Sequence, residues 1–297
     1  MPFEGFDSSL IPVHSQACGP LHIHAVRGGK QGPPLVLLHG YPQTYFIWHK
    51  IATRLAQHYQ VVCIDLRGYG KSSKPKGSDS HVEYSKREMA KDVVAVAQYY
   101  GFQSFNLICH DRGARVGHRL ALDHPHAVLK LMTLDICPTL YMYEHTNQHF
   151  ATKYWHWFFQ LIPGAEDIIM GNPAAYFRTA TRSYDFTTEA QQNYFQAFAT
   201  YESVHGSCED YRAAASIDLE HDRADRAAGK KLTVPELRVL WASQGLIPIY
   251  GDIVGVWREY SDPSVKITGR AVESNHYLPE MADEDIYKEI LAFVPPQ

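Results

Sequence analysis

Short apolar runs alternate with one long helical segment in the first half of the chain. The runs at residues 35–38, 61–64, 105–109 and 129–134 are rich in Val, Ile, Leu or Phe and are bounded by Gly, Pro, Asp or polar residues. Such runs are typical of buried strands in a parallel sheet. Between the second and third runs, apolar residues recur every three or four positions from 84 to 100, which predicts a helix. Strands that alternate with helices predict an α/β fold with a mostly parallel, doubly wound sheet.

The alternation stops near Pro138. Residues 141 to about 231 contain no strand-like run but hold many aromatic residues at helical spacing. A strand pattern returns at 237–241, a short one follows at 265–267, and a helical pattern covers 286–293. We therefore expect an α/β core in two parts, 1–138 and 233–297, with a helical lid (cap) at 139–232. The lid would cover the carboxyl ends of the strands, where ligands bind in open sheets.

Composition and charge narrow the class of partner. The net charge of -4 and the absence of a long basic run argue against nucleic acid, and no apolar run approaches the ~18 residues that span a bilayer. Acidic residues precede the first basic residue, Arg27, so no signal peptide is expected and the cytoplasm is the expected location. Five cysteines without a C-x-x-C pair argue against a disulfide framework and a thiolate zinc site. The pairs His22/His24 and His124/His126 lack the spacing of a helical zinc site, so neither a metal nor an organic cofactor is expected.

The stretch C-H-D-R-G-A at 109–114 follows a predicted strand and precedes a helical pattern. Small residues around a central side chain describe a nucleophile elbow, in which a strained turn presents the nucleophile and lets strand and helix cross closely. The central residue here is Asp111. Alone, the hexapeptide would favour a plain strand-to-helix turn with an Asp at the helix N-cap.

Two further segments favour the nucleophile elbow over a plain turn. His39-Gly40-Tyr41-Pro42 closes the strand at 35–38, so the amides of Tyr41 and Arg112 are candidate donors of an oxyanion hole. Near the C-terminus, His276 lies in a loop after the last short strand. A lone histidine is usually structural, but beside an Asp elbow it is a candidate base.

At this point the chain resembles the α/β-hydrolase superfamily, in the dehalogenase and epoxide hydrolase branches that use an Asp nucleophile. The resemblance implies the order nucleophile, acid, histidine. The acid usually follows the strand at 237–241, where this chain has no carboxylate until Asp252. The strand at 129–134 instead leads directly into Asp135. We predict Asp135 as the acid that orients His276, with Asp252 as the alternative.

An Asp nucleophile implies a particular chemistry. An ionised carboxylate can displace a leaving group from saturated carbon and form an alkyl ester with the enzyme. Water activated by His276 then attacks the carboxyl carbon of that ester. Neighbouring guanidinium groups should lower the pKa of Asp111 and keep it ionised.

Arg112 and Arg115 lie three positions apart, on one face of the predicted helix. Two guanidinium groups beside the nucleophile could bind a small carboxylate, although salt-bridged surface arginines are the usual alternative. A carboxylate held there leaves its own α-carbon within reach of Asp111, which implies a short 2-substituted acid. In the aromatic stretch, the N–H groups of His156 and Trp157 could solvate a departing halide, whereas the stretch alone would suggest lid core.

Together, D-R-G-A-R at 111–115, Asp135, H-W at 156–157 and C-E-D-Y-R at 208–212 look like the fluoroacetate (haloacetate) dehalogenases, over residues 35 to about 293. The resemblance implies hydrolysis of a small 2-haloacid without a cofactor, and often a homodimer. It assigns Asp111 as nucleophile, Asp135 and His276 as the acid–base pair, Arg112 and Arg115 to the substrate carboxylate, and His156 and Trp157 to the halide.

Two positions depart from the family. Cys109 stands where the elbow usually has Gly, which adds bulk at a tight crossing. Ser216 stands where the family has a Tyr as third halide donor. Because fluoride needs the strongest donors of any halide, we expect chloroacetate or bromoacetate to be turned over relatively better, or a larger 2-haloacid to fit.

Two other functions stay open. An epoxide hydrolase would use the same Asp–His pair with two lid tyrosines on the epoxide oxygen. The lid offers Tyr141, Tyr143, Tyr154, Tyr176, Tyr184, Tyr194, Tyr201 and Tyr211. A hydrolase-fold protein could also bind a small carboxylate without turning it over.

Overall fold

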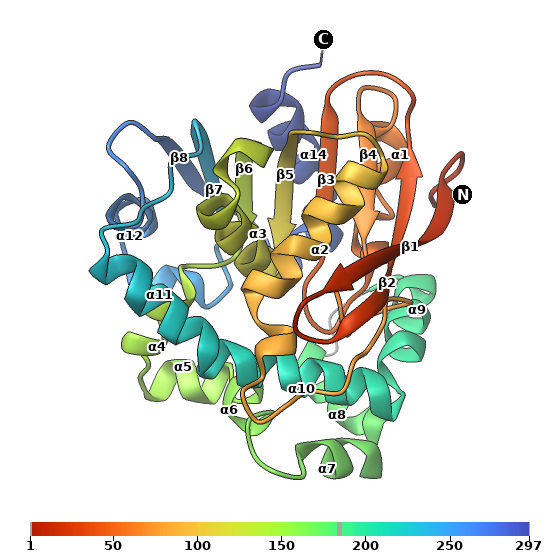
Figure 1. The fold of residues 1–297 in the computed structure, drawn as a ribbon, viewed down its shortest axis with the longest axis vertical. Helices are drawn as coiled ribbons and strands as arrows, with labels where there is room; N and C mark the ends of the chain where they lie inside the picture. The colour runs from red at the N-terminus through yellow and green to blue at the C-terminus, as the bar shows by residue number, and fades with distance from the viewer. Residues whose placement is uncertain (1, 183–185, 297) are drawn as a thin grey trace.

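An eight-stranded sheet forms the centre of the computed structural model, which describes residues 2–182 and 186–296 (Figure 1). The strands are β1 (Asp7–Ser15), β2 (Gly19–Gly28), β3 (Pro34–Leu38), β4 (Gln60–Ile64), β5 (Phe105–His110), β6 (Val128–Leu134), β7 (Glu236–Ala242) and β8 (Lys266–Val272). Their order is β1-β2-β4-β3-β5-β6-β7-β8, and every pairing from β4 through β8 is parallel. The predicted α/β fold with a mostly parallel sheet is therefore confirmed.

The apolar runs are buried on both faces of the sheet, which is why they show no alternation. Val36 and Leu38 of β3 belong to one apolar core, and Leu35 and Leu37 belong to the core on the opposite face. Helices pack on each side because α/β crossovers cover both faces. The first core includes residues of α2 (Lys86–Tyr99), α3 (Asp111–Asp123) and α12 (Ile253–Glu259), and the second includes residues of α1 (Ala52–Leu55), α13 (Leu278–Met281) and α14 (Asp283–Phe293).

The outer strands differ from the sequence-based expectation. The pattern predicts no strand before residue 35, yet β1 and β2 form an antiparallel pair that joins the sheet through β4. In β1 only alternate positions such as Ile11 and Val13 are buried, so the strand contains no continuous apolar run. The strand expected at 265–267 extends over all of β8, whose side chains are mostly exposed at the opposite edge. Edge strands therefore carry a weaker hydrophobic signal than central ones.

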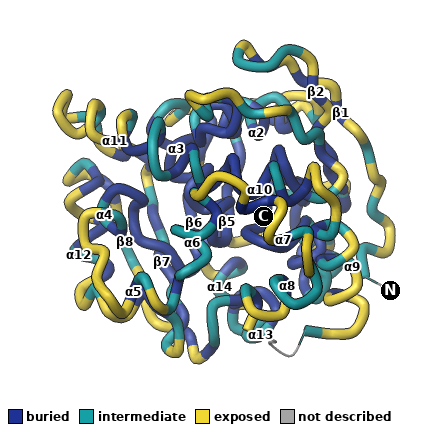
Figure 2. Tube along the Cα trace, turned by 90° about the horizontal axis from the view of Figure 1, so that it is seen from below, coloured by how far each residue is buried: buried dark blue, intermediate teal, exposed yellow. Residues whose placement is uncertain are grey.

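A helical insertion lies between β6 and β7. Its helices are α4 (Thr139–Glu144), α5 (Gln148–Lys153), α6 (His156–Phe159), α7 (Ala165–Gly171), α8 (Pro173–Thr181), α9 (Thr188–Phe198), α10 (Tyr201–Ala215) and α11 (Ile217–Ala227). In Figure 1 it lies below the sheet, at the end to which the arrow of β5 points. Figure 2, seen from that side, shows the buried traces of β5 and β6 near the centre of the view and exposed turns around the rim. None of the helices in the described ranges is long and apolar enough to cross a membrane.

Candidate active site

Asp111 lies at the junction of β5 and α3, with φ of 47°. This left-handed conformation is uncommon for a residue other than glycine, and strain of this kind is typical of functional turns. The loop after β3 approaches so closely that a Cβ on Gly40 would lie 2.4 Å from the Cβ of Asp111. That approach allows the Tyr41 amide to donate to Oδ1 of Asp111 at 2.9 Å. The Arg112 amide belongs to the first turn of α3, where amides have no partner within the helix.

Cys109 fits the elbow because residue 117 has no side chain. A Cβ on Gly117 would lie 2.6 Å from Sγ of Cys109. The sulfur therefore occupies the space that a side chain at position 117 of α3 would fill. The bulk expected from Cys109 is accommodated on the helix side of the crossing.

His276 lies between two carboxylates. Its Nδ1 is 2.5 Å from Oδ2 of Asp135, and its Nε2 is 3.6 Å from Oδ2 of Asp111. The Ala242 amide of β7 donates to the other oxygen of Asp135 at 2.9 Å and fixes that carboxylate. Asp252 is exposed and accepts from the Gly255 amide at the start of α12. The structure therefore places Asp135, and not Asp252, beside the histidine.

Neighbouring charges and hydrogen bonds together outweigh burial in setting the pKa values of Asp111 and His276. Burial alone would raise the pKa of Asp111, but the hydrogen bond and charge of His276 hold it well below its usual range. Arg115 acts in the same direction with a smaller effect, so the histidine matters more than the guanidinium groups. Burial alone would lower the pKa of His276, but Asp111 and Asp135 raise it to about 9. The resting site thus holds an imidazolium between carboxylates at neutral pH.

A cavity opens onto Asp111, with about 360 Å³ of empty space that partly reaches solvent. Its lining comprises Tyr41, Asp111, Tyr154, His156, Ala180, Arg182, Tyr211, His276 and Tyr277. The rings of His156 and Tyr41 stack at 5.8 Å. Burial lowers the pKa of His156 to about 3, so this imidazole is neutral and one ring N–H is a donor.

Arg112 is fully buried and is already held by an acid of the insertion. Its Nε and Nη2 each donate at 2.8 Å to the carboxylate of Asp210, which also forms an ion pair with Lys86. Only Nη1 lacks a hydrogen-bond partner among the described residues. Arg112 and Arg115 were both predicted to bind the substrate carboxylate, but Asp210 already accepts from two of the three nitrogens of Arg112.

Arg115 is 3% exposed and forms no ion pair within the described parts of the chain. Its Nη1 donates to Oγ1 of Thr139 at 3.0 Å and its Nη2 to Sδ of Met142 at 3.3 Å. Its Nε has no partner among the described residues. Both arginines therefore lie inside the protein, and neither is among the residues that line the cavity.

Trp157 lies behind His156, completely buried, and its Nε1 has no partner in the described ranges. Its ring is 4.5 Å from the guanidinium carbon of Arg115. Ser216, between α10 and α11, donates its hydroxyl to the Arg212 carbonyl at 2.7 Å. This hydroxyl is therefore used within the insertion itself.

Two of the lid tyrosines face the nucleophile. Tyr154 and Tyr211 line the cavity, and the Tyr154 hydroxyl lies 3.3 Å from Nδ1 of His276. The sequence does not indicate which lid tyrosines face the cavity, because the lid helices carry aromatic residues on several sides. The pairing of Asp210 with Arg112 joins residues 98 positions apart, so no local sequence pattern indicates it. Tyr184 lies outside the described residues.

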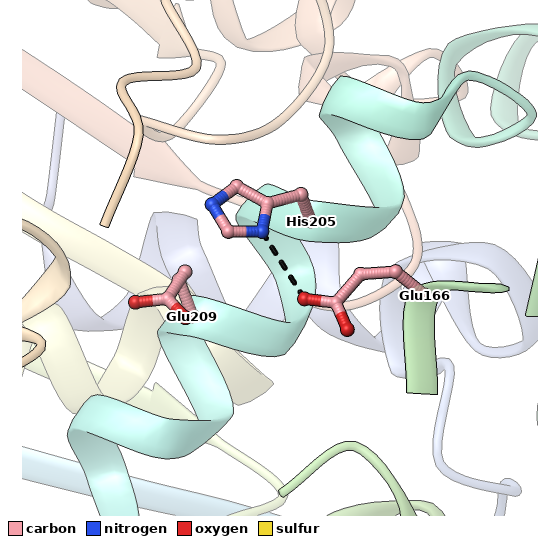
Figure 3. Close-up of side chains that lie close together, drawn as sticks. All are labelled: Glu166, His205 and Glu209. Atoms are coloured by element: carbon pink, nitrogen blue, oxygen red, sulfur yellow. Dashed lines mark hydrogen bonds and ion pairs between the residues drawn. The ribbon is translucent and has the colours of Figure 1, made fainter. Parts of the chain in front are cut away.

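One group of three side chains in the described residues has the composition of a metal site. Glu166, His205 and Glu209 of the insertion lie close together, with Nδ1 of His205 3.1 Å from Glu166 (Figure 3). Arg212 already donates to Glu166 at 2.6 Å and to Glu209 at 2.9 Å. The arginine compensates their charge, and none of the three lines the cavity at Asp111.

Known proteins share both the fold and the sequence. A family model described as alpha/beta hydrolase fold matches residues 33–214. A fluoroacetate dehalogenase from Burkholderia sp is 42% identical, over 86% of this chain and 84% of the relative. A soluble epoxide hydrolase from Corynebacterium sp. (strain C12) is 28% identical, over 97% of this chain and 99% of the relative.

Solved structures agree with that result. A crystal structure from Nostoc sp PCC 7120, provisionally described as an alpha/beta hydrolase, matches with a TM-score of 0.91 and 44% identity, over 99% of both chains. The family model covers more than half of the chain. The chain belongs to the alpha/beta hydrolase family.

Proposed function

We propose that the protein hydrolyses a small 2-haloacid, such as chloroacetate, to the 2-hydroxyacid and a halide through an ester on Asp111. The observation that carries the proposal is a buried Asp111 whose pKa is held low by His276, 3.6 Å away, on a helix that also carries two buried arginines. Arg115 has no acidic partner in the described ranges, and Arg112 keeps one unused N–H group. The 42% identity to a fluoroacetate dehalogenase supports the same substrate class.

The two carboxylate oxygens of Asp111 have different surroundings. The Tyr41 amide holds Oδ1, which leaves Oδ2 to attack the α-carbon while the carbon–halogen bond breaks and the halide departs. Oδ1 then becomes the carbonyl oxygen of the ester, already hydrogen-bonded to an oxyanion donor. The amide of Arg112 is the second proposed donor.

Ester formation also changes the histidine. The ester carries no charge, so His276 loses one of the two anions that raise its pKa. The imidazolium can then release its proton and accept one from water, which attacks the carboxyl carbon of the ester. Collapse of the adduct breaks the bond from the carboxyl carbon to the ester oxygen. The product alkoxide takes the proton from His276, and the carboxyl proton that remains on Asp111 then passes to His276. This restores the imidazolium and the Asp111 carboxylate, which now holds one oxygen from water.

Single turnover of chloroacetate in ¹⁸O-water tests this sequence. We expect halide release and an isotopically heavier peptide containing Asp111, because water attacks the enzyme's carboxyl carbon. Asp135→Asn should release one equivalent of halide and then stall at the ester, because Asp135 acts through His276 in ester hydrolysis. Asp111→Asn should abolish or greatly slow halide release itself. Asp252→Asn is the matched control and should retain it, since Asp252 only caps α12.

Label in the product alone, with an unlabelled Asp111 peptide, would refute the ester. Halide release that survives Asp111→Asn would refute the nucleophile. Binding of chloroacetate without any turnover would favour a carboxylate-binding protein.

The halogen preference follows from Ser216. Its hydroxyl is hydrogen-bonded to a backbone carbonyl, so we expect fluoroacetate to be a poorer substrate than chloroacetate. Halide release from both acids, with Ser216→Tyr alongside, measures this. A fluoroacetate preference that Ser216→Tyr does not alter would contradict the reasoning.

A specific observation also favours epoxide hydrolysis as a second candidate. Tyr154 and Tyr211 lie in the cavity wall with Asp111, where phenolic hydroxyls could protonate an epoxide oxygen. Burial raises the pKa of both well above the usual value, so both are neutral donors. Diol formation from styrene oxide without halide release from chloroacetate would select this function.

A further inference from the structure

One face of the short helix α4 surrounds Arg115. Thr139, Met142 and Tyr143 are spaced at i, i+3 and i+4, so their side chains share a face. The first two accept hydrogen bonds from Nη1 and Nη2 of Arg115. The helix thus fixes the guanidinium group with two neutral acceptors and brings a third side chain, Tyr143, beside it.

Tyr143 packs against the same indole as the arginine. Its ring centroid is 5.3 Å from that of Trp157, and the guanidinium carbon of Arg115 is 4.5 Å from the Trp157 ring. Burial raises the pKa of the Tyr143 hydroxyl to about 12, while the charges of Arg112 and Arg115 act in the opposite direction. The hydroxyl is therefore a neutral donor near both guanidinium groups.

Four buried donors of this region have no hydrogen-bond partner within the described residues. They are Nη1 of Arg112, Nε of Arg115, Nε1 of Trp157 and the Tyr143 hydroxyl. Buried donors without an acceptor are unfavourable, and a carboxylate offers about four acceptor positions. A small anion that reached this place from the cavity would satisfy several of them at once.

We propose that the Tyr143 hydroxyl hydrogen-bonds the carboxylate of the substrate beside Arg112 and Arg115, and so helps to select acids over neutral substrates. This assignment rests on the proposed function. The carboxylate, and not the halide, is the expected acceptor because Tyr143 packs on the same Trp157 ring as the Arg115 cation. Tyr143 is a specificity-determining residue in this arrangement, and the bond-making steps remain those of Asp111 and His276.

Acetate and bromide separate the two ends of the substrate. Acetate has the carboxylate without a leaving group, and bromide represents the leaving group alone. Titration of each into the protein, followed by NMR on the indole N–H signal of Trp157, requires no turnover. Trp157→Phe assigns the signal.

Tyr143→Phe removes one hydroxyl and keeps the ring contact with Trp157. We expect it to weaken acetate binding about tenfold, as for one hydrogen bond to a charged group, and to leave bromide binding unchanged. The KM for chloroacetate should rise by a similar factor. Tyr100→Phe is the matched control, because its hydroxyl is also buried without a partner in the described ranges but its ring packs on Tyr99, at the end of α2. We expect no change from it.

Unchanged acetate binding in Tyr143→Phe, a loss confined to bromide, or an equal loss in Tyr100→Phe would overturn the assignment of Tyr143. Halide release by the wild-type protein would then still support the proposed function. If the wild-type protein neither binds acetate nor releases halide from haloacetates, both proposals fail.

Discussion

Replacing Asp111 with asparagine should lower the pKa of His276 from about 9 to roughly 6–7. Nε2 of His276 lies 3.6 Å from Oδ2 of Asp111. At an effective dielectric constant of about 20, two unit charges at this separation attract by roughly 4–5 kcal/mol, which corresponds to a pKa change of about 3. The histidine side chain is 14% exposed, so solvent screening reduces the change somewhat. Asp135 stays in place and keeps the pKa from falling further.

A ¹⁵N NMR titration of the histidine rings measures this value directly. The chain has 17 histidines, so His276→Gln is needed to assign the signal. Asp252→Asn is the control and should leave the pKa near its wild-type value. If Asp111→Asn changes the pKa by less than about 0.5, the carboxylate is not what keeps His276 protonated. The proposed conversion of His276 into a base on ester formation would then lose its cause.

Two further predictions concern stability. Gly117→Ala should destabilise the fold by roughly 1–3 kcal/mol, because the new Cβ would lie 2.6 Å from Sγ of Cys109, and Cys109→Ala should relieve this in the double variant. Urea denaturation of the four proteins measures the coupling, and strictly additive effects would contradict the steric explanation. Glu280 accepts a hydrogen bond from the Tyr194 hydroxyl, and burial raises its pKa to about 7. The contribution of Glu280 to stability is therefore complete below its unfolded pKa of about 4.5 and is lost as the pH rises through 7. Glu280→Gln should therefore gain up to about 3 kcal/mol relative to wild type between pH 5 and pH 9, and an equal difference at both pH values would refute the coupling.

The central sheet could be predicted because its strands are buried on both faces. A short, continuous apolar run such as the one in β3 or β5 is typical of a buried parallel strand. The hairpin of β1 and β2 was missed since half of the β1 side chains face solvent. The extent of β8 was missed for the same reason. Pairing with neighbouring strands defines these edge elements more than their own composition does.

The candidate site was predictable where one segment defines it. Asp111 lies in a recognisable elbow, and Asp135 follows a strand that pairs with the strand of Asp111. The pairing of Arg112 with Asp210 joins segments 98 residues apart and leaves no local pattern. The inward direction of Tyr154 and Tyr211 depends on how short helices pack, which spacing alone does not determine.

Asp210 has a consequence for engineering. This single carboxylate of the insertion accepts from Arg112 on α3 and from the Tyr69 hydroxyl, and it also pairs with Lys86 on α2. A chimaera that replaces residues 139–227 with the equivalent segment of a relative lacking this acid would leave Arg112 uncompensated and would leave Lys86 with Asp218 at most. Removing one partner of a buried ion pair typically destabilises a protein by about 3–5 kcal/mol. Exchange of substrate range between relatives by grafting this segment therefore has to transfer the acid and its cations together.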